Sequence, residues 1–333
     1  MHPLFPGQLC SQGVHVVRDF AFGNGQTLPE LKLAYTTLGP PSGQPVLVLH
    51  GTGGTGGGLL TAAFGGELFG PGKVLDAARH FIILPDAIGG GGSSKPSDGL
   101  RMAFPAYGYA DMVRAQHMLV RDHFGIGTLR LILGYSMGGM HTFMWGSMYP
   151  DAAKNLVALA ATPAEVAGRN WMTRRMLIDT IKLDPAWNEG NYREQPAGLA
   201  LAQAYFNMAT NGGDQHLHQL AGSHAAADSY VDAQLAAPAR GDANDLIYQF
   251  SASRDYAPGP HLEKITARLL AITSADDERN PPHLGLMEPA MARVANGAHH
   301  LIPASAETCG HATCGQARWW SAKLAEFLDG AQG

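Results

Sequence analysis

The chain has 333 residues, of which 45% are hydrophobic and 15% charged, a composition that excludes extended disorder and is typical of a folded globular protein. The formal net charge is −5, so no basic excess is present to neutralise phosphates, and we expect no nucleic-acid partner. No apolar stretch approaches the roughly 20 residues of a transmembrane helix. The N-terminal segment also lacks the pattern of a secretory signal. These features predict a cytoplasmic protein without a membrane partner.

Short β-rich segments, separated later in the chain by helical patterns, predict a mostly parallel sheet of eight strands with helices on both faces. The third segment is almost entirely apolar, as a strand buried on both faces should be. The strands are expected at Val14–Phe22, Leu31–Leu38, Pro45–His50, Phe81–Pro85, Leu129–Leu133, Leu156–Ala160, Leu269–Thr273 and His300–Pro303. The sequence therefore predicts an α/β fold.

The alternation of strands and helices stops between residues 163 and 260, where the sequence shows helical patterns and no convincing strand. We expect helices at Trp171–Leu183, Ala197–Thr210 and Leu217–Leu235. An insertion after the sixth strand lies above the carboxyl edge of the sheet, where ligands bind in open α/β folds. We therefore predict a core of residues 1–162 and 261–333 and a helical cap of residues 163–260.

The strongest chemical signal is the segment Gly134–Gly138, which reads Gly-Tyr-Ser-Met-Gly. It follows an apolar strand and precedes a helical pattern, which is the strand–turn–helix setting of the G-x-S-x-G nucleophile elbow of the α/β-hydrolase fold. Small residues must flank the serine because the turn is crowded. The hydroxyl of Ser136 is then presented at a helix N-terminus, whose free N–H groups favour negative charge. Ser136 is the predicted nucleophile.

A serine hydroxyl needs a base to remove its proton, and in this fold the order along the chain is Ser, Asp or Glu, then His. His311 follows the last predicted strand and is the predicted base. Both Asp276 and Asp277 follow the seventh strand and could orient the imidazole. An aspartate four residues before a proline is common in this fold, and this pattern favours Asp277, with Asp276 as a loop-capping residue.

The glycine-rich loop after the third strand, Gly51–Gly58, resembles an H-G-x-G oxyanion loop. We expect the backbone N–H groups of Thr52 and Met137 to hold the oxyanion, with Gly51 and Tyr135 beside the substrate. A phosphate-binding loop is the alternative, but its G-K-[ST] ending is missing. Cys309 and Cys314 flank His311, yet recognised metal-ligand spacing is absent, so we expect free thiols and neither a metal nor a cofactor.

From the nucleophile elbow onward, the chain resembles the homoserine O-acetyltransferase family. The resemblance implies an α/β-hydrolase core, a helical cap, an acyl group taken up by Ser136 and, in many members, a homodimer. It covers most of the chain, including the cap. It is carried by Ser136–Met140, Trp145, Tyr149 and Pro150, by Asp184, Pro185, Trp187, Gly190 and Tyr192, and by Asp242–Asn244, Tyr248, Asp255 and Tyr256.

Two departures from that family concern the acceptor. The family has an aspartate for the homoserine amine directly after the catalytic histidine, whereas this chain has Ala312. The cap arginine expected to hold the substrate carboxylate is not cleanly matched, because Arg174 and Arg175 lie about one helical turn early. Glu278 and Glu307 lie in polar stretches and are expected to be solvated rather than to replace the aspartate.

These features favour a serine hydrolase that cleaves a small-molecule carboxylic ester through an acyl-enzyme on Ser136. The first alternative is an acyl-CoA-dependent O-acyltransferase of the homoserine acetyltransferase type, which shares the first half of the reaction. A second is a binding protein that uses the fold without catalysis.

Overall fold

The computed structural model describes residues 2–330 and contains the predicted eight-stranded sheet. The sheet follows the order β1-β2-β4-β3-β5-β6-β7-β8. Its strands are β1 (Cys10–Ala21), β2 (Thr27–Leu38), β3 (Gln44–Leu49), β4 (His80–Pro85), β5 (Leu129–Tyr135), β6 (Ala153–Leu159), β7 (Arg268–Ser274) and β8 (Gly297–Ile302). β1 and β2 pair antiparallel with their neighbours, and β3 to β8 are parallel.

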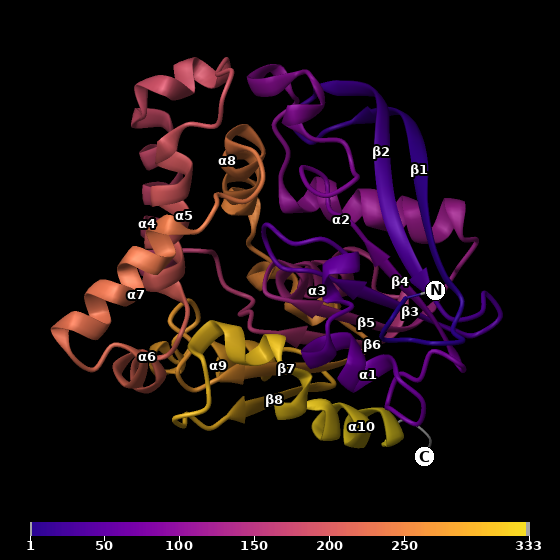
Figure 1. Ribbon diagram of the computed structural model, residues 1–333. Coiled ribbons are helices and arrows are strands. Elements are labelled where there is room, and N and C mark those ends of the chain that lie inside the picture. Colours follow the sequence, from indigo (N-terminus) through magenta and orange to yellow (C-terminus); the bar gives the residue numbers. More distant parts are fainter. Residues whose placement is uncertain (1, 331–333) are drawn as a thin grey trace.

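Helices cover both faces of the sheet, as expected, and Figure 1 shows them on either side of the strands. Side chains along β3 alternate between two apolar clusters, because successive residues of a strand point to opposite faces. One cluster contains residues of α2 (Tyr109–Met118), α3 (Met137–Met148) and α9 (Met287–Met291). The other contains residues of α1 (Glu67–Phe69) and α10 (Ser321–Asp329).

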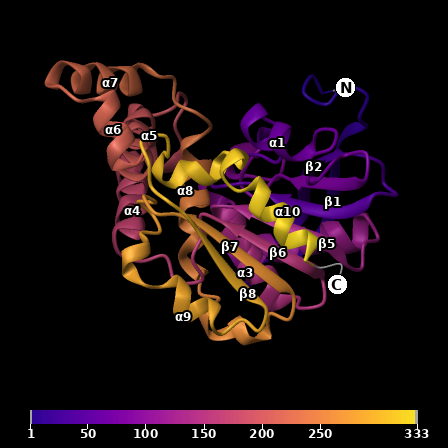
Figure 2. The same cartoon turned by 90° about the horizontal axis from the view of Figure 1, so that it is seen from below.

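The insertion after β6 is helical, as predicted, and Figure 2 shows most of it grouped on one side of the sheet. Apolar side chains of α4, α5 and α8 form a separate small core. Its helices are α4 (Gly168–Leu183), α5 (Ala197–Thr210), α6 (Asp214–Leu220), α7 (His224–Ala236) and α8 (Ala243–Ser251).

Three details of the sequence interpretation were wrong. The single helix expected at Leu217–Leu235 is divided between α6 and α7, since Ser223 caps the second helix by accepting from the N–H of Ala226. The helix α8 was not expected. The last strand begins three residues earlier and ends one residue earlier than predicted, so His299 also lies inside it. The proposed domain boundaries remain predictions, and their terminal residues 1 and 331–333 lie outside the described part of the chain.

Hydrogen bonds from α8 and the segment after it attach the cap to the core. The carboxylate of Asp245 accepts from the N–H and hydroxyl of Ser97, and the Tyr248 hydroxyl bonds the carbonyl of Phe104 at 2.6 Å. The Tyr256 hydroxyl donates to the carbonyl of Thr162. α8 is therefore fixed to the loops that surround the carboxyl edge of the sheet.

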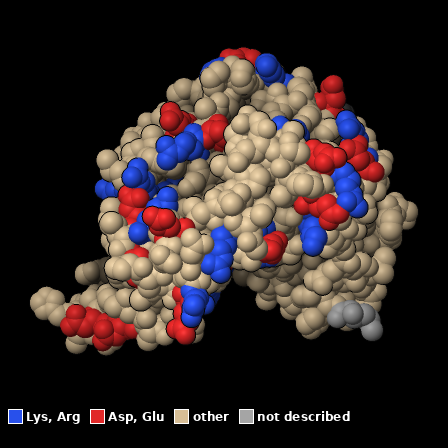
Figure 3. Space-filling view, turned by 90° about the horizontal axis from the view of Figure 1, so that it is seen from above, with Lys and Arg blue, Asp and Glu red and all other residues tan. Residues whose placement is uncertain are grey.

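The surface in Figure 3 carries Lys and Arg interspersed with Asp and Glu, without a large area of one charge. No helix between residues 2 and 330 combines the length and apolar character that crossing a bilayer requires.

The turn between β5 and α3 is tightly packed against neighbouring backbone. A Cβ atom added to Gly134 would lie 1.9 Å from the carbonyl oxygen of Gly138, and one on Gly138 would lie 2.2 Å from that of Leu49. Ser136 between them has φ 56° and ψ −112°, a strained conformation for a residue with a side chain. Glycine at these two positions is what permits the turn.

We predict that Gly138→Ala lowers the free energy of unfolding by about 3 kcal/mol or more, because the new methyl group meets backbone atoms of β3 that cannot move aside. Urea unfolding of the purified variants measures this difference. Gly127→Ala is the matched control, since no atom lies within 4 Å of its added Cβ. Equal stability of the two variants would contradict the packing described for the turn.

Candidate active site

The nucleophile elbow places Ser136 at the N-terminus of α3. Its N–H donates to the carbonyl of Leu159 at 2.9 Å, which ties the turn to the end of β6. The side chain is only 3% exposed. Ser136 thus lies beneath the surface, at the carboxyl edge of the sheet.

The structure brings together the three residues expected to act as nucleophile, base and acid. Ser136 Oγ lies 2.8 Å from His311 Nε2, and His311 Nδ1 lies 3.0 Å from both carboxylate oxygens of Asp277. The carboxylate can only accept, so Nδ1 carries the imidazole proton and Nε2 is free to accept the proton of Ser136. His311 and Asp277 are 2% and 1% exposed.

Burial and hydrogen-bond partners determine the charges of Asp277 and His311. Burial opposes ionisation of Asp277, but His311 and the Asn280 amide and backbone N–H lower the pKa of its carboxyl below the usual value. Burial also lowers the pKa of His311, with Asp277 opposing and Arg279 assisting the shift. The resting pair is therefore an ionised Asp277 beside a neutral imidazole.

Asp276 occupies the position of a loop-capping residue. One oxygen accepts from the Thr308 hydroxyl at 2.7 Å and from the Gly310 N–H at 3.1 Å, and the other accepts from the Ser274 hydroxyl. No hydrogen bond joins it to the ring of His311 within residues 2–330. Asp276 holds the loop that carries the histidine, while Asp277 contacts the imidazole itself.

The glycine-rich loop after β3 is oriented by His50. Its Nε2 accepts from the Ala87 N–H at 3.0 Å, so the proton is on Nδ1, which donates to the Gly51 carbonyl at 2.8 Å. The Gly54 N–H also donates to this carbonyl. In a trans peptide the C=O and the following N–H point in opposite directions, so these bonds turn the Thr52 N–H away from His50.

The N–H groups of Thr52 and Met137 have no hydrogen-bond acceptor among residues 2–330. The added Cβ of Gly51 would lie 3.3 Å from Ser136 Cβ, so the oxyanion loop passes directly beside the serine. The two N–H groups predicted for an oxyanion hole are therefore available to a ligand.

The remaining residues predicted to contact substrate differ in position. The Tyr135 hydroxyl is directed to the carbonyl of His311 at 3.4 Å, so the ring packs beside the histidine loop. Arg174 is fully buried and bonds Asn170 Oδ1 and the Ser253 hydroxyl. Arg175 is exposed and pairs with Asp179 on the outer side of α4. Of the two arginines, only Arg174 lies near the site.

Three polar residues near the site escaped the sequence analysis. Glu278 was expected in solvent, but it is half-buried and accepts from two backbone N–H groups. Arg279 beside it donates hydrogen bonds to Thr210 and Asn211 of the cap. Gln249 of α8 donates to the Gly89 carbonyl and has a buried Oε1 without a partner within residues 2–330. Because α8 itself was not expected, nothing in the sequence pointed to this glutamine.

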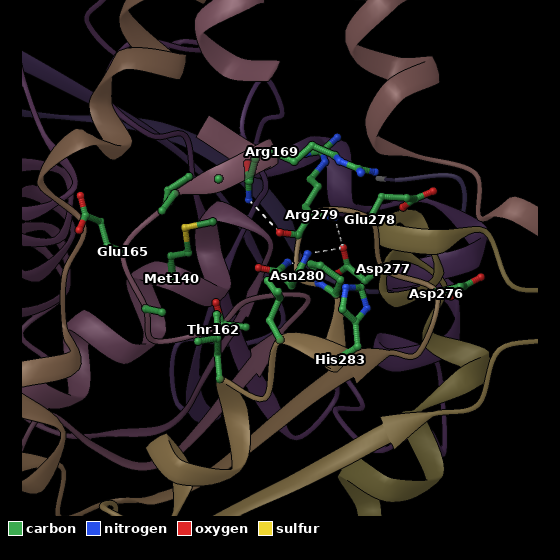
Figure 4. A pocket seen from close by; sticks show the side chains of 18 of the residues that line it. Met140, Thr162, Glu165, Arg169, Asp276, Asp277, Glu278, Arg279, Asn280 and His283 are labelled. Atoms are coloured by element: carbon green, nitrogen blue, oxygen red, sulfur yellow. Dashed lines mark hydrogen bonds between the residues drawn. The ribbon is translucent and has the colours of Figure 1, made fainter. Parts of the chain in front are cut away.

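A cavity of about 530 Å³ borders the loop after β7, which carries Asp277. Figure 4 shows Asp277, Asn280 and Arg279 on one side of it, with Met140 and Glu165 across the space. Ser136 and His311 do not line this cavity. Of the three predicted catalytic residues, only Asp277 lines it.

The family described as the alpha/beta hydrolase fold matches residues 44–282. The homoserine O-acetyltransferase of Methanohalobium evestigatum is 29% identical over 88% of this chain and 67% of its own length. That of Leptospira biflexa serovar Patoc is 30% identical over 78% of each protein. Two further homoserine O-acetyltransferases, from Geotalea species, match over 55% and 53% of their length.

Among solved structures, the acetyl esterase MekB is similar over 96% of this chain and 97% of its own, with a TM-score of 0.82 and 24% identity. This likeness shows a common fold. The match to the family model and the 30% identity over 78% of the Leptospira protein show more than a common fold. The chain belongs to the α/β-hydrolase fold family and is related to the homoserine O-acetyltransferases.

Proposed function

We propose that the protein is a serine ester hydrolase that forms an acyl-enzyme on Ser136. The observation that carries this proposal is the hydrogen-bonded chain from Ser136 Oγ through His311 to Asp277. Its neutral imidazole faces the hydroxyl it must deprotonate. The two unbonded N–H groups of Thr52 and Met137 support it, since a tetrahedral intermediate needs such donors.

In the proposed reaction, Ser136 Oγ attacks the ester carbonyl carbon while His311 Nε2 takes the hydroxyl proton. The oxyanion is held by the N–H groups of Thr52 and Met137. His311 then returns the proton to the leaving alcohol as the bond to the acyl carbon breaks. Water attacks the acyl-enzyme in the same way and releases the carboxylic acid. Asp277 stabilises the imidazolium in both steps.

Water is proposed as the acceptor because the site offers no clear partner for the ammonium group of an amino acid. Ala312, directly after the base, supplies no charge. The nearest candidate, Glu278, already accepts from the N–H groups of Gly213 and His311. An unpaired ammonium in a desolvated site costs several kcal/mol. Acyl-CoA-dependent O-acyl transfer is the second candidate, supported by the sequence relatives named homoserine O-acetyltransferases.

Arg174 is the proposed contact for a negatively charged part of the substrate. It is fully buried without a carboxylate partner among the described residues, and one of its guanidinium nitrogens has no hydrogen bond there. Buried charges are normally paired. Gly51 and Tyr135 remain proposed neighbours of the substrate, on the basis of their contacts with Ser136 and His311.

We expect the purified protein to hydrolyse p-nitrophenyl acetate with a higher kcat/KM than it shows for acetyl transfer from acetyl-CoA to homoserine. The reason is the missing countercharge beside His311. Nitrophenol release and free thiol release, measured on the same preparation, compare the two reactions. Faster acetyl transfer to homoserine would reject hydrolysis and favour the transferase.

We also expect graded losses from substitutions in the site. Ser136→Ala should lower kcat by a factor on the order of 10⁶, and Asp277→Asn by a factor on the order of 10⁴, because the imidazole then adopts the wrong tautomer. Asp276→Asn should cost much less activity than Asp277→Asn, because Asp276 bonds the loop that carries His311 and not the imidazole itself. If Asp276→Asn were crippling and Asp277→Asn harmless, the assignment of the acid would be wrong.

A further inference from the structure

Four consecutive residues, Asp276–Arg279, form the acid loop. They bind two segments that lie far apart in the sequence. One is the loop that carries His311. The other is the cap turn, residues 210–213, which joins α5 to α6. The acid loop therefore touches both the base and the cap through neighbouring side chains, and Glu278 contacts both directly.

On the side of the base, the acid loop holds the backbone of Gly310 and His311 as well as the imidazole ring of His311. Glu278 Oε2 accepts from the N–H of His311 at 2.9 Å, and Asp276 accepts from the N–H of Gly310 at 3.1 Å. Asp277 holds the ring of the same histidine. Both the main chain and the side chain of His311 thus depend on this loop.

On the side of the cap, Glu278 Oε1 accepts from the N–H of Gly213 at 2.6 Å. Arg279 donates to the Thr210 carbonyl and to Asn211 Oδ1, each at 3.1 Å. The N–H of Gly212 donates to the carbonyl of Cys309, two residues before the base. The cap turn is therefore hydrogen-bonded to both loops that position His311.

The fit of the cap turn is close. Gly213 has φ +69°, and a Cβ atom there would lie 2.5 Å from Asp276 Oδ2 and 2.9 Å from the N–H nitrogen of Gly310. Only glycine combines this backbone conformation with such an approach. The turn is shaped to seat against the acid and histidine loops.

Ser136 and His311 are only 3% and 2% exposed, so access of a substrate to them is narrow. Movement of the cap turn would take the Gly213 N–H away from Glu278 and leave a half-buried carboxylate short of a donor, which is costly. The carboxylate and the histidine backbone it holds would then be free to shift.

We propose that Glu278 is a positioning residue that couples closure of the cap to alignment of His311. The inference rests on the proposed serine mechanism. With the cap turn seated, one carboxylate bridges the Gly213 and His311 N–H groups and the base faces Ser136. With the turn displaced, the base loses this alignment. Cap closure thus activates the nucleophile in addition to covering the substrate.

The test compares Glu278→Gln, Asn211→Ala and Glu307→Gln by the rate at which a small fluorophosphonate labels Ser136. Glutamine presents one acceptor to two N–H donors. Asn211→Ala removes a cap contact of Arg279 without touching Ser136, His311 or Asp277. Glu307 is exposed and outside these contacts, so its variant is the matched control.

The labelling rate of the variants should rise if the cap only limits access to Ser136, and should fall if the cap also aligns the base. If closure aligns His311, Glu278→Gln slows labelling about tenfold or more and Asn211→Ala about threefold, as expected for one charge-assisted and one weaker hydrogen bond. The kcat for p-nitrophenyl acetate falls in parallel, with little change in KM. Glu307→Gln matches the wild type.

Labelling of both Glu278→Gln and Asn211→Ala at or above the wild-type rate would overturn the coupling, because a loosened cap would then merely ease access. Thermal unfolding of each variant shows whether it is folded, and Asn211→Ala decides the question if Glu278→Gln is not. A wild-type protein that the reagent does not label would instead reject the serine mechanism on which the inference rests.

Discussion

The hydrogen bonds between Asp277 and the Nδ1–H of His311 determine what the rest of the site can do. An isolated carboxylate buried to this degree would be neutral, because desolvation penalises its charge. His311 and Asn280 supply the compensating partners, and in return the carboxylate fixes the tautomer of the ring. Without that tautomer, the Nε2 atom that faces Ser136 could not accept its proton.

The order of strands explains how these groups meet. Ser136 follows β5, Asp277 follows β7 and His311 follows β8, and all three strands run parallel in one sheet. Their carboxyl ends therefore open on the same edge. Ala160, directly after β6 between these strands, contributes a carbonyl that accepts from the Asn280 amide. The sheet thus brings the three side chains to one edge.

Local sequence was sufficient for the parts of the site built by one strand and the loop after it. The elbow around Ser136, the glycine loop at Gly51 and the preference for Asp277 over Asp276 all follow from short motifs with a steric or geometric reason. In the structure, Ser136, His311 and Asp277 form one hydrogen-bonded chain. The eight-stranded sheet was predictable for the same reason, because apolar runs mark each central strand.

The parts that depend on docking between distant segments could not be predicted in this way. Glu278 is polar in a polar stretch, and only the approach of Gly213 and His311 explains its burial. Likewise, Arg174 and Arg175 are adjacent and chemically identical, but one faces the interior and the other the solvent. The direction of a helix face becomes known only when its packing partner is known.

The proposed hydrolysis depends on an acyl group that Ser136 carries and releases to water. It can be tested by rapid acid quenching of the protein with p-nitrophenyl acetate, followed by mass spectrometry of its peptides. We expect an acetyl group on the peptide that contains Ser136, formed with a burst of nitrophenol and lost in water alone. An acetyl group that persisted until homoserine was added, or nitrophenol release with no acetylated Ser136, would contradict it.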